Sequence, residues 1–237
     1  MADFNRPSPA IPGVPTDRAL IDAGLRAHMV RVFNYMALGV ALTGVVAWLT
    51  SQIVGPALLN SPLMWVFILA PLALVFFISF RINSLSAGAA LTLFFVYAAS
   101  VGLSLATIFF VYTGTSITRV FFITAAAFGG LSLWGYTTQR SLSGFGSFLF
   151  MGLIGVIIAS LVNIFLRSSG LDWIISVIGV VVFAGLTAWD TQKIKEMYDP
   201  MDDGTVAGRK AVMGALSLYL DFINLFMMLL RLFGNRR

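Results

Sequence analysis

The sequence predicts an all-α, polytopic membrane protein with seven transmembrane helices. Of its 237 residues, 59% are hydrophobic and only 11% are charged, and the mean hydropathy is +0.92. Because a soluble domain carries about 25% charged residues, this composition places the chain in the membrane class. The alternating pattern of a membrane β-barrel is absent. We therefore expect helices, since backbone that faces lipid has to be hydrogen-bonded within its own segment.

The transmembrane segments are found by length, because a spanning helix needs about 20 mostly apolar residues. The segments that meet this requirement lie at about 32–54, 62–80, 87–112, 118–138, 146–166, 173–191 and 211–233. Several of the short separators hold Gly, Pro, Ser or Asn, as turns do: VGPALLNSP, RINSLS, YTGTS and RSSGLD. Glycines within the spans, among them Gly129, Gly130 and Gly179, indicate close helix packing. Residues 32–237 are predicted to form one membrane domain.

Residues 1–31 differ from the rest and are predicted to form a cytoplasmic tail. The stretch MADFNRPSPAIPGVP is rich in proline, which predicts partial disorder. The following stretch, TDRALIDAGLRAHMVRVF, indicates an amphipathic helix that is capped by Thr16 or Asp17 and runs into the first span. His28 lies in this charged stretch and is expected at the surface. The first apolar run begins too late and is too long for a signal peptide, so the first span is expected to remain as an anchor.

The distribution of Lys and Arg predicts the orientation, since these residues are enriched in cytoplasmic segments. With a cytoplasmic N-terminus, the inside segments hold Arg6, Arg18, Arg26, Arg31, Arg81, Arg140, Lys193, Lys195, Arg209 and Lys210. The outside segments hold Arg119, Arg167, Arg231, Arg236 and Arg237. Seven full crossings place the C-terminal RLFGNRR outside, whereas a re-entrant last segment returns it to the inside, and the sequence leaves both open.

Several classes of function are excluded or disfavoured by composition. The chain has no cysteine, so thiolate catalysis and cysteine metal sites are excluded. No HExxH motif or cluster of histidines indicates a zinc site. The net charge of +5 comes from residues at segment ends, without the clustered basic face of a nucleic-acid-binding protein. No nucleophile–base pair, phosphate loop or cofactor motif is found, so we expect neither an enzyme nor a bound cofactor.

Asp221 is the most unusual residue, because it lies deep within the apolar run SLYLDFINLFMMLLRLFG. A charged acid near the bilayer centre is unfavourable by about 2.5–3.5 kcal/mol, so such residues normally face the bundle interior and have a function. At 100° per residue, Gly214, Ser217, Asp221, Asn224 and Arg231 fall on one stripe of this helix. A polar stripe on an otherwise apolar helix suggests a central helix that the other six enclose.

Asp190 ends the sixth apolar run, and by itself it could simply mark the end of a span. With the N-terminus inside, however, the end of the sixth span and the start of the seventh lie on the same side of the membrane. Asp190 and Asp221 are then expected at similar depths on adjacent helices, with Arg81 on the same side. Two acids and one arginine form a charge cluster, and calcium, which prefers oxygen ligands, suits an ionised acid pair.

These residues carry a family resemblance. The segments TAWDTQKIK and LYLDFINLFMMLLRLFG resemble the paired signature of the Bax inhibitor-1 (transmembrane Bax-inhibitor-motif) family in its bacterial branch, and the resemblance extends over about residues 20–237. It implies seven helices with the last one central, and a location in the bacterial inner membrane. It also implies a pH-sensitive calcium leak channel in which Asp190 and Asp221 share a proton. Arg81 matches the family's latch arginine by position, and Arg231 matches a second arginine of the signature.

One feature departs from the family pattern. The linker YDPMDDGTVAGRK between the sixth and seventh spans is long and acidic. Its Asp199, Asp202 and Asp203 form either a solvated loop or a stretch that attracts cations, and they lack the ligand spacing of an EF-hand.

Three alternatives to a channel make different demands on the sequence. An intramembrane aspartyl protease needs a GxGD motif, which neither TAWD nor LYLD provides. A retinal-type receptor needs a lysine within a span, whereas Lys193 and Lys195 lie past the end of the sixth. The serious rival is a non-channel regulator that binds other membrane proteins, such as a protease or a stress-response factor. Its function would depend on the tail or the linker rather than on the two aspartates.

Overall fold

Seven long helices dominate the computed structural model, which describes residues 17–55 and 61–237. Within these residues, the seven are long and apolar enough to cross a membrane, so the all-α, seven-span prediction is confirmed. The long helices are α1 (Asp17–Val54), α2 (Leu63–Arg81), α3 (Ala87–Leu105), α5 (Gly114–Thr137), α6 (Ser143–Leu166), α7 (Ser169–Glu196) and α8 (Gly204–Phe233). Two short helices, η2 (Ile82–Ser84) and α4 (Ile108–Val111), lie in the connections that follow α2 and α3.

Several helices begin before the predicted spans, and at α7 and α8 a polar side chain caps the earlier start. The Ser168 hydroxyl accepts a hydrogen bond from the backbone N–H of Leu171 and starts α7 before position 173. The Asp203 carboxylate accepts hydrogen bonds from the N–H groups of Thr205 and Val206 and starts α8 before position 211. Such caps satisfy backbone donors that the helix itself leaves free. The predicted span 87–112 is instead divided into α3 and α4.

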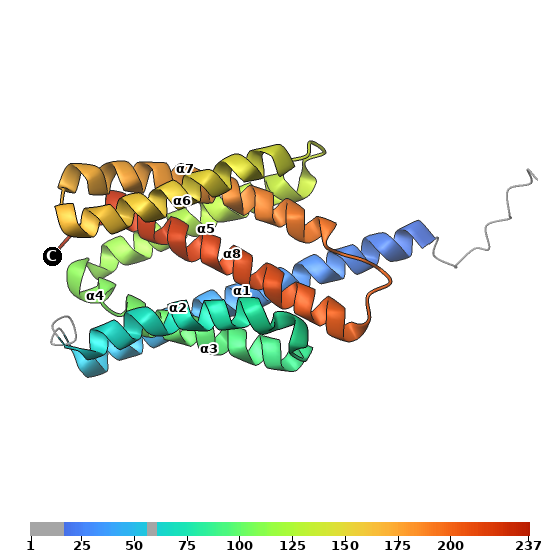
Figure 1. The fold of residues 1–237 in the computed structure, drawn as a ribbon, viewed down its shortest axis with the longest axis horizontal. Coiled ribbons are helices and arrows are strands. Elements are labelled where there is room, and N and C mark those ends of the chain that lie inside the picture. Colours follow the sequence, from blue (N-terminus) through green and yellow to red (C-terminus); the bar gives the residue numbers. More distant parts are fainter. Residues whose placement is uncertain (1–16, 56–60) are drawn as a thin grey trace, which may run out of the picture.

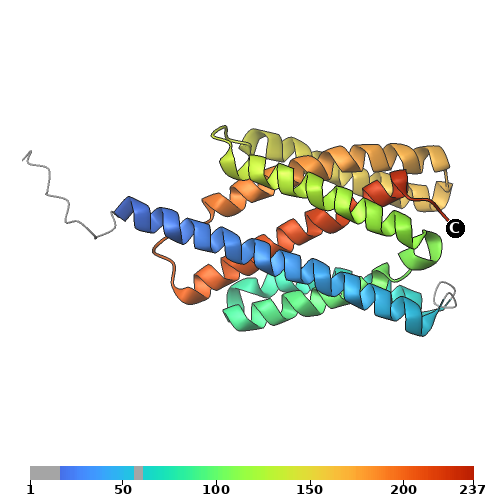
Figure 2. The same ribbon diagram turned by 180° about the vertical axis from the view of Figure 1, so that it is seen from behind.

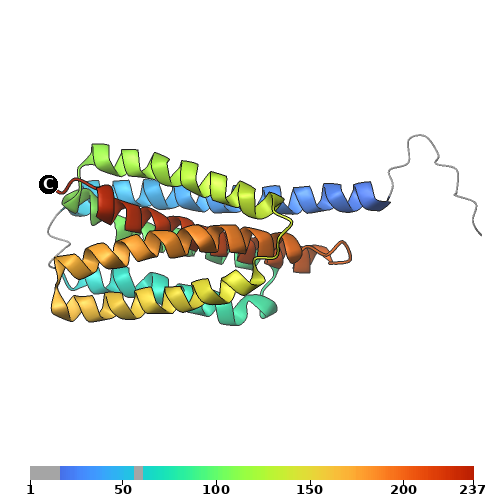
Figure 3. The same ribbon diagram turned by 90° about the horizontal axis from the view of Figure 1, so that it is seen from above.

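The first helix is continuous from Asp17 to Val54, so the amphipathic stretch and the first span are one element. Its 38 residues correspond to about 57 Å, and its N-terminal part extends beyond the other helices (Figure 3). The predicted disorder of residues 1–15 and the predicted cap at Thr16 lie outside the described residues. The expectation that His28 is at the surface is wrong. Its side chain is 7% exposed, because α1 packs against the end of α7, and its ring lies 5.8 Å from that of Tyr198.

Two groups of three long helices lie on either side of α8 (Figures 1 and 2). In one group, α1 and α2 pack on α3, and in the other, α5 and α6 pack on α7. Helix α8 runs obliquely between the groups and packs on α1, α3, α5 and α7. That all six other helices enclose α8 stays a prediction.

Helix α8 crosses the whole bundle. It has 30 residues, or about 45 Å, and the C-terminus lies at the end opposite to the α7–α8 linker (Figure 1). The chain that follows α8 is held by backbone hydrogen bonds to the connection between α4 and α5. The N–H of Thr113 donates to the carbonyl of Asn235 over 3.1 Å, and the N–H of Arg237 donates to the carbonyl of Val111 over 3.0 Å. Helix α8 is thus continuous from one end of the bundle to the other, as a full crossing requires.

The rotation of α8 about its axis is fixed by Tyr219, a fully buried residue. Thr43 of α1 donates its hydroxyl proton to the carbonyl of Ala98 in α3 over 2.8 Å. The Tyr219 hydroxyl therefore donates to the Thr43 oxygen, 2.7 Å away. The Tyr219 ring also makes edge-to-face contacts with Phe94 and Tyr97 of α3, each with centroids 5.7 Å apart. Three helices are thus joined at one point.

We expect Tyr219→Phe to lower the free energy of unfolding by about 0.6–1 kcal/mol, because it removes one interhelical hydrogen bond and keeps the ring contacts. Thr43→Val should destabilise more, since it breaks both bonds and leaves the Ala98 carbonyl and the Tyr219 hydroxyl without this partner. Thermal or denaturant unfolding in detergent measures both. Equal effects of the two substitutions would contradict this account of the contact.

Candidate functional site

The structure brings together the two acids that the sequence analysis singled out. Asp221 lies near the middle of α8 and is 4% exposed. Asp190 lies six residues before the end of α7 and is half-buried. The two carboxyl groups face each other within membrane-spanning helices, close enough to interact electrostatically. An acid pair therefore links two helices of the bundle from within.

Asp190 is positioned by contacts that hold the end of α7 to the turn between α5 and α6. The Gln192 amide accepts a hydrogen bond from the N–H of Leu142 over 2.7 Å and donates to the carbonyl of Arg140 over 2.9 Å. The Lys195 ammonium donates to the carbonyl of Tyr136 over 2.9 Å. These two side chains therefore tie the end of α7 to backbone groups of α5 and of the α5–α6 turn.

Asp221 is positioned by the rotation of α8. It lies two residues after Tyr219, so the two side chains leave the helix about 200° apart. Tyr219 is bound to α1 and α3, and Asp221 consequently points to α7 on the other side. Further along α8 toward its N-terminal end, Gly214 lies close to Ile194 of α7, which brings the two helices near one another beside the pair.

The surroundings of the pair supply few hydrogen-bond donors. The hydroxyls of the buried Thr187 and Thr191 donate to carbonyls of their own helix, those of Phe183 and Thr187. The Oδ2 atom of Asp221 is buried and finds no donor among the described residues. A proton on one of the two carboxyl groups provides such a donor, because a protonated acid carries an O–H. Lys193, whose ammonium lies 4.9 Å from the Trp189 ring centroid, exerts an electrostatic attraction on Asp190.

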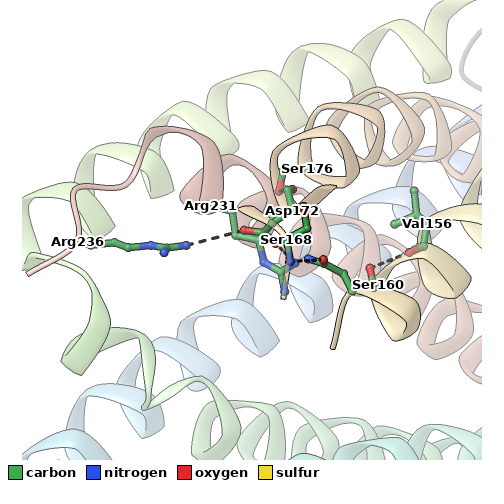
Figure 4. A network of polar contacts seen from close by, with 8 residues as sticks. Val156, Ser160, Ser168, Asp172, Ser176, Arg231 and Arg236 are labelled. Carbon is green, nitrogen blue, oxygen red and sulfur yellow. Dashed lines mark hydrogen bonds and ion pairs between the residues drawn. The ribbon is translucent and has the colours of Figure 1, made fainter. Parts of the chain in front are cut away.

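Neither predicted arginine forms an ion pair with the two acids among the described residues. Arg81 ends α2 with an exposed side chain and takes part in none of the ion pairs among the described residues. Arg231 is ten residues beyond Asp221, or about 15 Å along α8, and it faces Asp172 of α7 instead, 3.5 Å away (Figure 4). Ser217 and Asn224 are half-buried, and the Asn224 amide donates to the carbonyl of Leu220 in its own helix. The predicted arginine latch is therefore not formed in this conformation.

The acids of the α7–α8 linker have structural roles. Asp203 caps α8, Asp199 accepts a hydrogen bond from the N–H of Met201, and Asp202 forms an ion pair with Lys210. Within the described residues, no group of three or more His, Asp or Glu side chains is arranged to hold a metal ion. Each of these three acids thus has a partner within the chain.

A comparison with known protein families identifies the family of this chain. A family model described as "Inhibitor of apoptosis-promoting Bax1" matches residues 25–237. The chain belongs to the Bax inhibitor-1 family. The two signature segments of this Bax inhibitor-1 protein form the end of α7 and most of α8, and each contributes one acid of the pair.

Proteins similar to this chain occur in several bacteria. "Inner membrane protein YbhL" of Escherichia coli K12 is 50% identical over 220 residues, which cover 91% of this chain and 94% of the relative. "Uncharacterized protein RP147" of Rickettsia prowazekii is 48% identical over 218 residues, which cover 91% and 92%. A protein of Caulobacter vibrioides is 43% identical over 253 aligned positions, which cover both chains completely. The similarity to YbhL and the seven spans agree on an integral, multi-pass membrane protein.

Proposed function

We propose that this protein is a pH-sensitive calcium leak channel of the bacterial inner membrane, gated by Asp190 and Asp221. The observation that carries the proposal is the contact between the two carboxyl groups, which joins α7 to α8 within the membrane. Calcium as the transported ion follows from the family resemblance and from the chemistry of carboxylates, which are hard oxygen ligands. The N-terminus is proposed to be cytoplasmic, on the basis of the Lys and Arg distribution.

The gate closes with a proton and opens without it. A hydrogen bond between two carboxyl groups requires a proton on one of them, and this proton holds α7 and α8 together. When it leaves, two negative charges remain in contact. At 4 Å and an effective dielectric constant of 20, such a repulsion amounts to about 4 kcal/mol. The repulsion separates α7 from α8 at the pair, so the open state is favoured as the pH rises.

Calcium and protons compete for the same oxygens in this mechanism. A calcium ion takes six to eight oxygen ligands, and the pair offers up to four. Water and backbone carbonyls complete the shell of a passing ion, which suits weak binding and release rather than storage. The exposed position of Arg81 means that the proposal rests on the acid pair alone.

The test is calcium flux into proteoliposomes at about pH 6 and about pH 8, with empty liposomes as the baseline. We expect the flux to be higher at the higher pH, because deprotonation opens the gate. Protein that is folded and inserted but gives no flux above empty liposomes would refute the channel. That outcome would favour the alternative, a regulator that binds other membrane proteins, and co-purification with and without residues 1–16 would then be the next measurement.

A further inference from the structure

A lipid-facing groove lies between α6 and α8 at the end of the bundle opposite to the linker. Both helices pack on α7, which forms the floor of the groove, and α6 has its main packing partner in α7. The groove is a cavity of about 270 Å³. Its walls are successive helical turns of α6 and α8, and its lining includes Ile157, Leu161, Ile164, Phe183 and Met228. The three residues of α6 are half exposed or more, so the groove is open to acyl chains.

A polar cavity of about 300 Å³ continues this groove toward the membrane boundary. It is lined by Ser160, Asn163, Asp172 and Arg231, and it shares Ser160, Ile164 and Arg231 with the groove. Figure 4 shows Asp172 with Arg231 on one side and Arg236, which follows α8, on the other. The site therefore changes from apolar to polar along its length, like a phospholipid molecule.

The two guanidinium groups are only loosely engaged. The nitrogen–oxygen distances to Asp172 are 3.5 Å from Arg231 and 3.8 Å from Arg236, longer than a hydrogen bond of 2.7–3.2 Å. Among the described residues, neither guanidinium donates a hydrogen bond, and Asp172 is the ion-pair partner of both. Their planar sets of donors match the oxygens of a phosphate. Arg236 is also held in place, because its neighbours Asn235 and Arg237 are bonded to the α4–α5 connection.

The charge at this end of the bundle favours an anion. Its positive side chains are Arg119, Arg167, Arg231, Arg236 and Arg237. Asp172 is the one acid among the described residues there. Trp173, next to Asp172, is largely exposed, as aromatic residues at the level of lipid headgroups are.

We propose that this site binds an anionic phospholipid, with its phosphate against the guanidinium groups of Arg231 and Arg236, beside Asp172, and an acyl chain in the groove between α6 and α8. The phosphate forms the short hydrogen bonds that Asp172 does not. The bound lipid joins α6, α7, α8 and the C-terminal chain at one point. This site is separate from the acid pair, and the proposal does not depend on the channel function.

Native mass spectrometry of the full-length protein in detergent tests the proposal, with phosphatidylglycerol and phosphatidylethanolamine added separately. We expect phosphatidylglycerol to bind about tenfold more tightly, and Arg231→Gln with Arg236→Gln to remove that preference. Arg236→Gln alone should weaken binding several-fold. Because this side chain is 65% exposed and lies beyond α8, the single variant is expected to fold.

The matched control is Arg119→Gln, which removes a positive charge from the same end but lies outside the groove. It should change the affinity less than twofold. Equal binding of the two lipids, or an equal loss with Arg119→Gln, would overturn the site. Competition by inorganic phosphate at millimolar concentration would also overturn it, since a free anion rather than a lipid would then be the ligand.

Discussion

Asp221→Asn is expected to abolish the rise of calcium flux between pH 6 and pH 8. The asparagine amide donates a hydrogen bond to Asp190 as the protonated acid does, so the contact between α7 and α8 is kept. Only one negative charge then remains at high pH, and the repulsion that opens the gate is absent. Because that repulsion is about 4 kcal/mol, the flux at pH 8 should fall at least about tenfold, to the level at pH 6. Asp190→Asn should have the same effect.

The control for these variants is Asp199→Asn, which removes an exposed acid of the linker. The amide oxygen of the variant still accepts the hydrogen bond from Met201, so the turn is retained. This protein should keep the wild-type pH dependence. A pH response that survives in both Asp190→Asn and Asp221→Asn would remove the acid pair from the gating mechanism.

Gly135→Ala is expected to destabilise the bundle more than the other packing changes considered. A Cβ atom at this position of α5 would overlap the carbonyl oxygen of Ala188 and lie 2.9 Å from its Cα. Backbone of α7 cannot turn away as a side chain does, so α5 and α7 have to separate. Overpacking of this kind destabilises by about 1–3 kcal/mol. Because Ala188 is two residues before Asp190, the acid pair should also be displaced, which lowers the pH response.

The matched control is Gly130→Ala in the same helix, where nothing lies within 4 Å of the added atom. Alanine favours a helix over glycine by about 1 kcal/mol, so this variant should be as stable as the wild type or more so. Thermal unfolding of both variants in one detergent measures the difference. Equal melting temperatures of Gly135→Ala and Gly130→Ala would contradict the close approach of α5 to α7.

Much of the fold was predictable, because the length of an apolar run reports directly on a membrane-spanning helix. The ends of the helices were less predictable. Helix α8 begins at Gly204 rather than 211, because Asp203 caps it outside the apolar run. Packing was least predictable, since glycines look alike in a sequence. Gly129 and Gly130 were expected to be contact points and have open space beside them, whereas Gly179 does lie close to Met228 and Gly135, which was not singled out, lies against the backbone of α7.

The acid pair could be predicted as well, since an aspartate within an apolar run is rare and its helix carries a polar stripe. The partners of Arg81 and Arg231 could not be predicted, because they depend on which helix ends lie together. Arg231 faces Asp172, an acid that no sequence pattern marked. The burial of His28 was not predicted, for the same reason. A lone histidine among charged residues gives no sign that α7 covers it, and only its contact with Tyr198 shows this.

The position of α8 between the two groups of helices has a consequence for biosynthesis. The groups α1–α3 and α5–α7 make few direct contacts with each other and are joined through α8, which leaves the ribosome after both groups. Until then, α1–α3 and α5–α7 lie in the membrane without the helix that joins them, and Asp190 of α7 is exposed. Termination before residue 204 should therefore leave a product that membrane quality-control proteases recognise, while a full-length chain escapes them in a single late step.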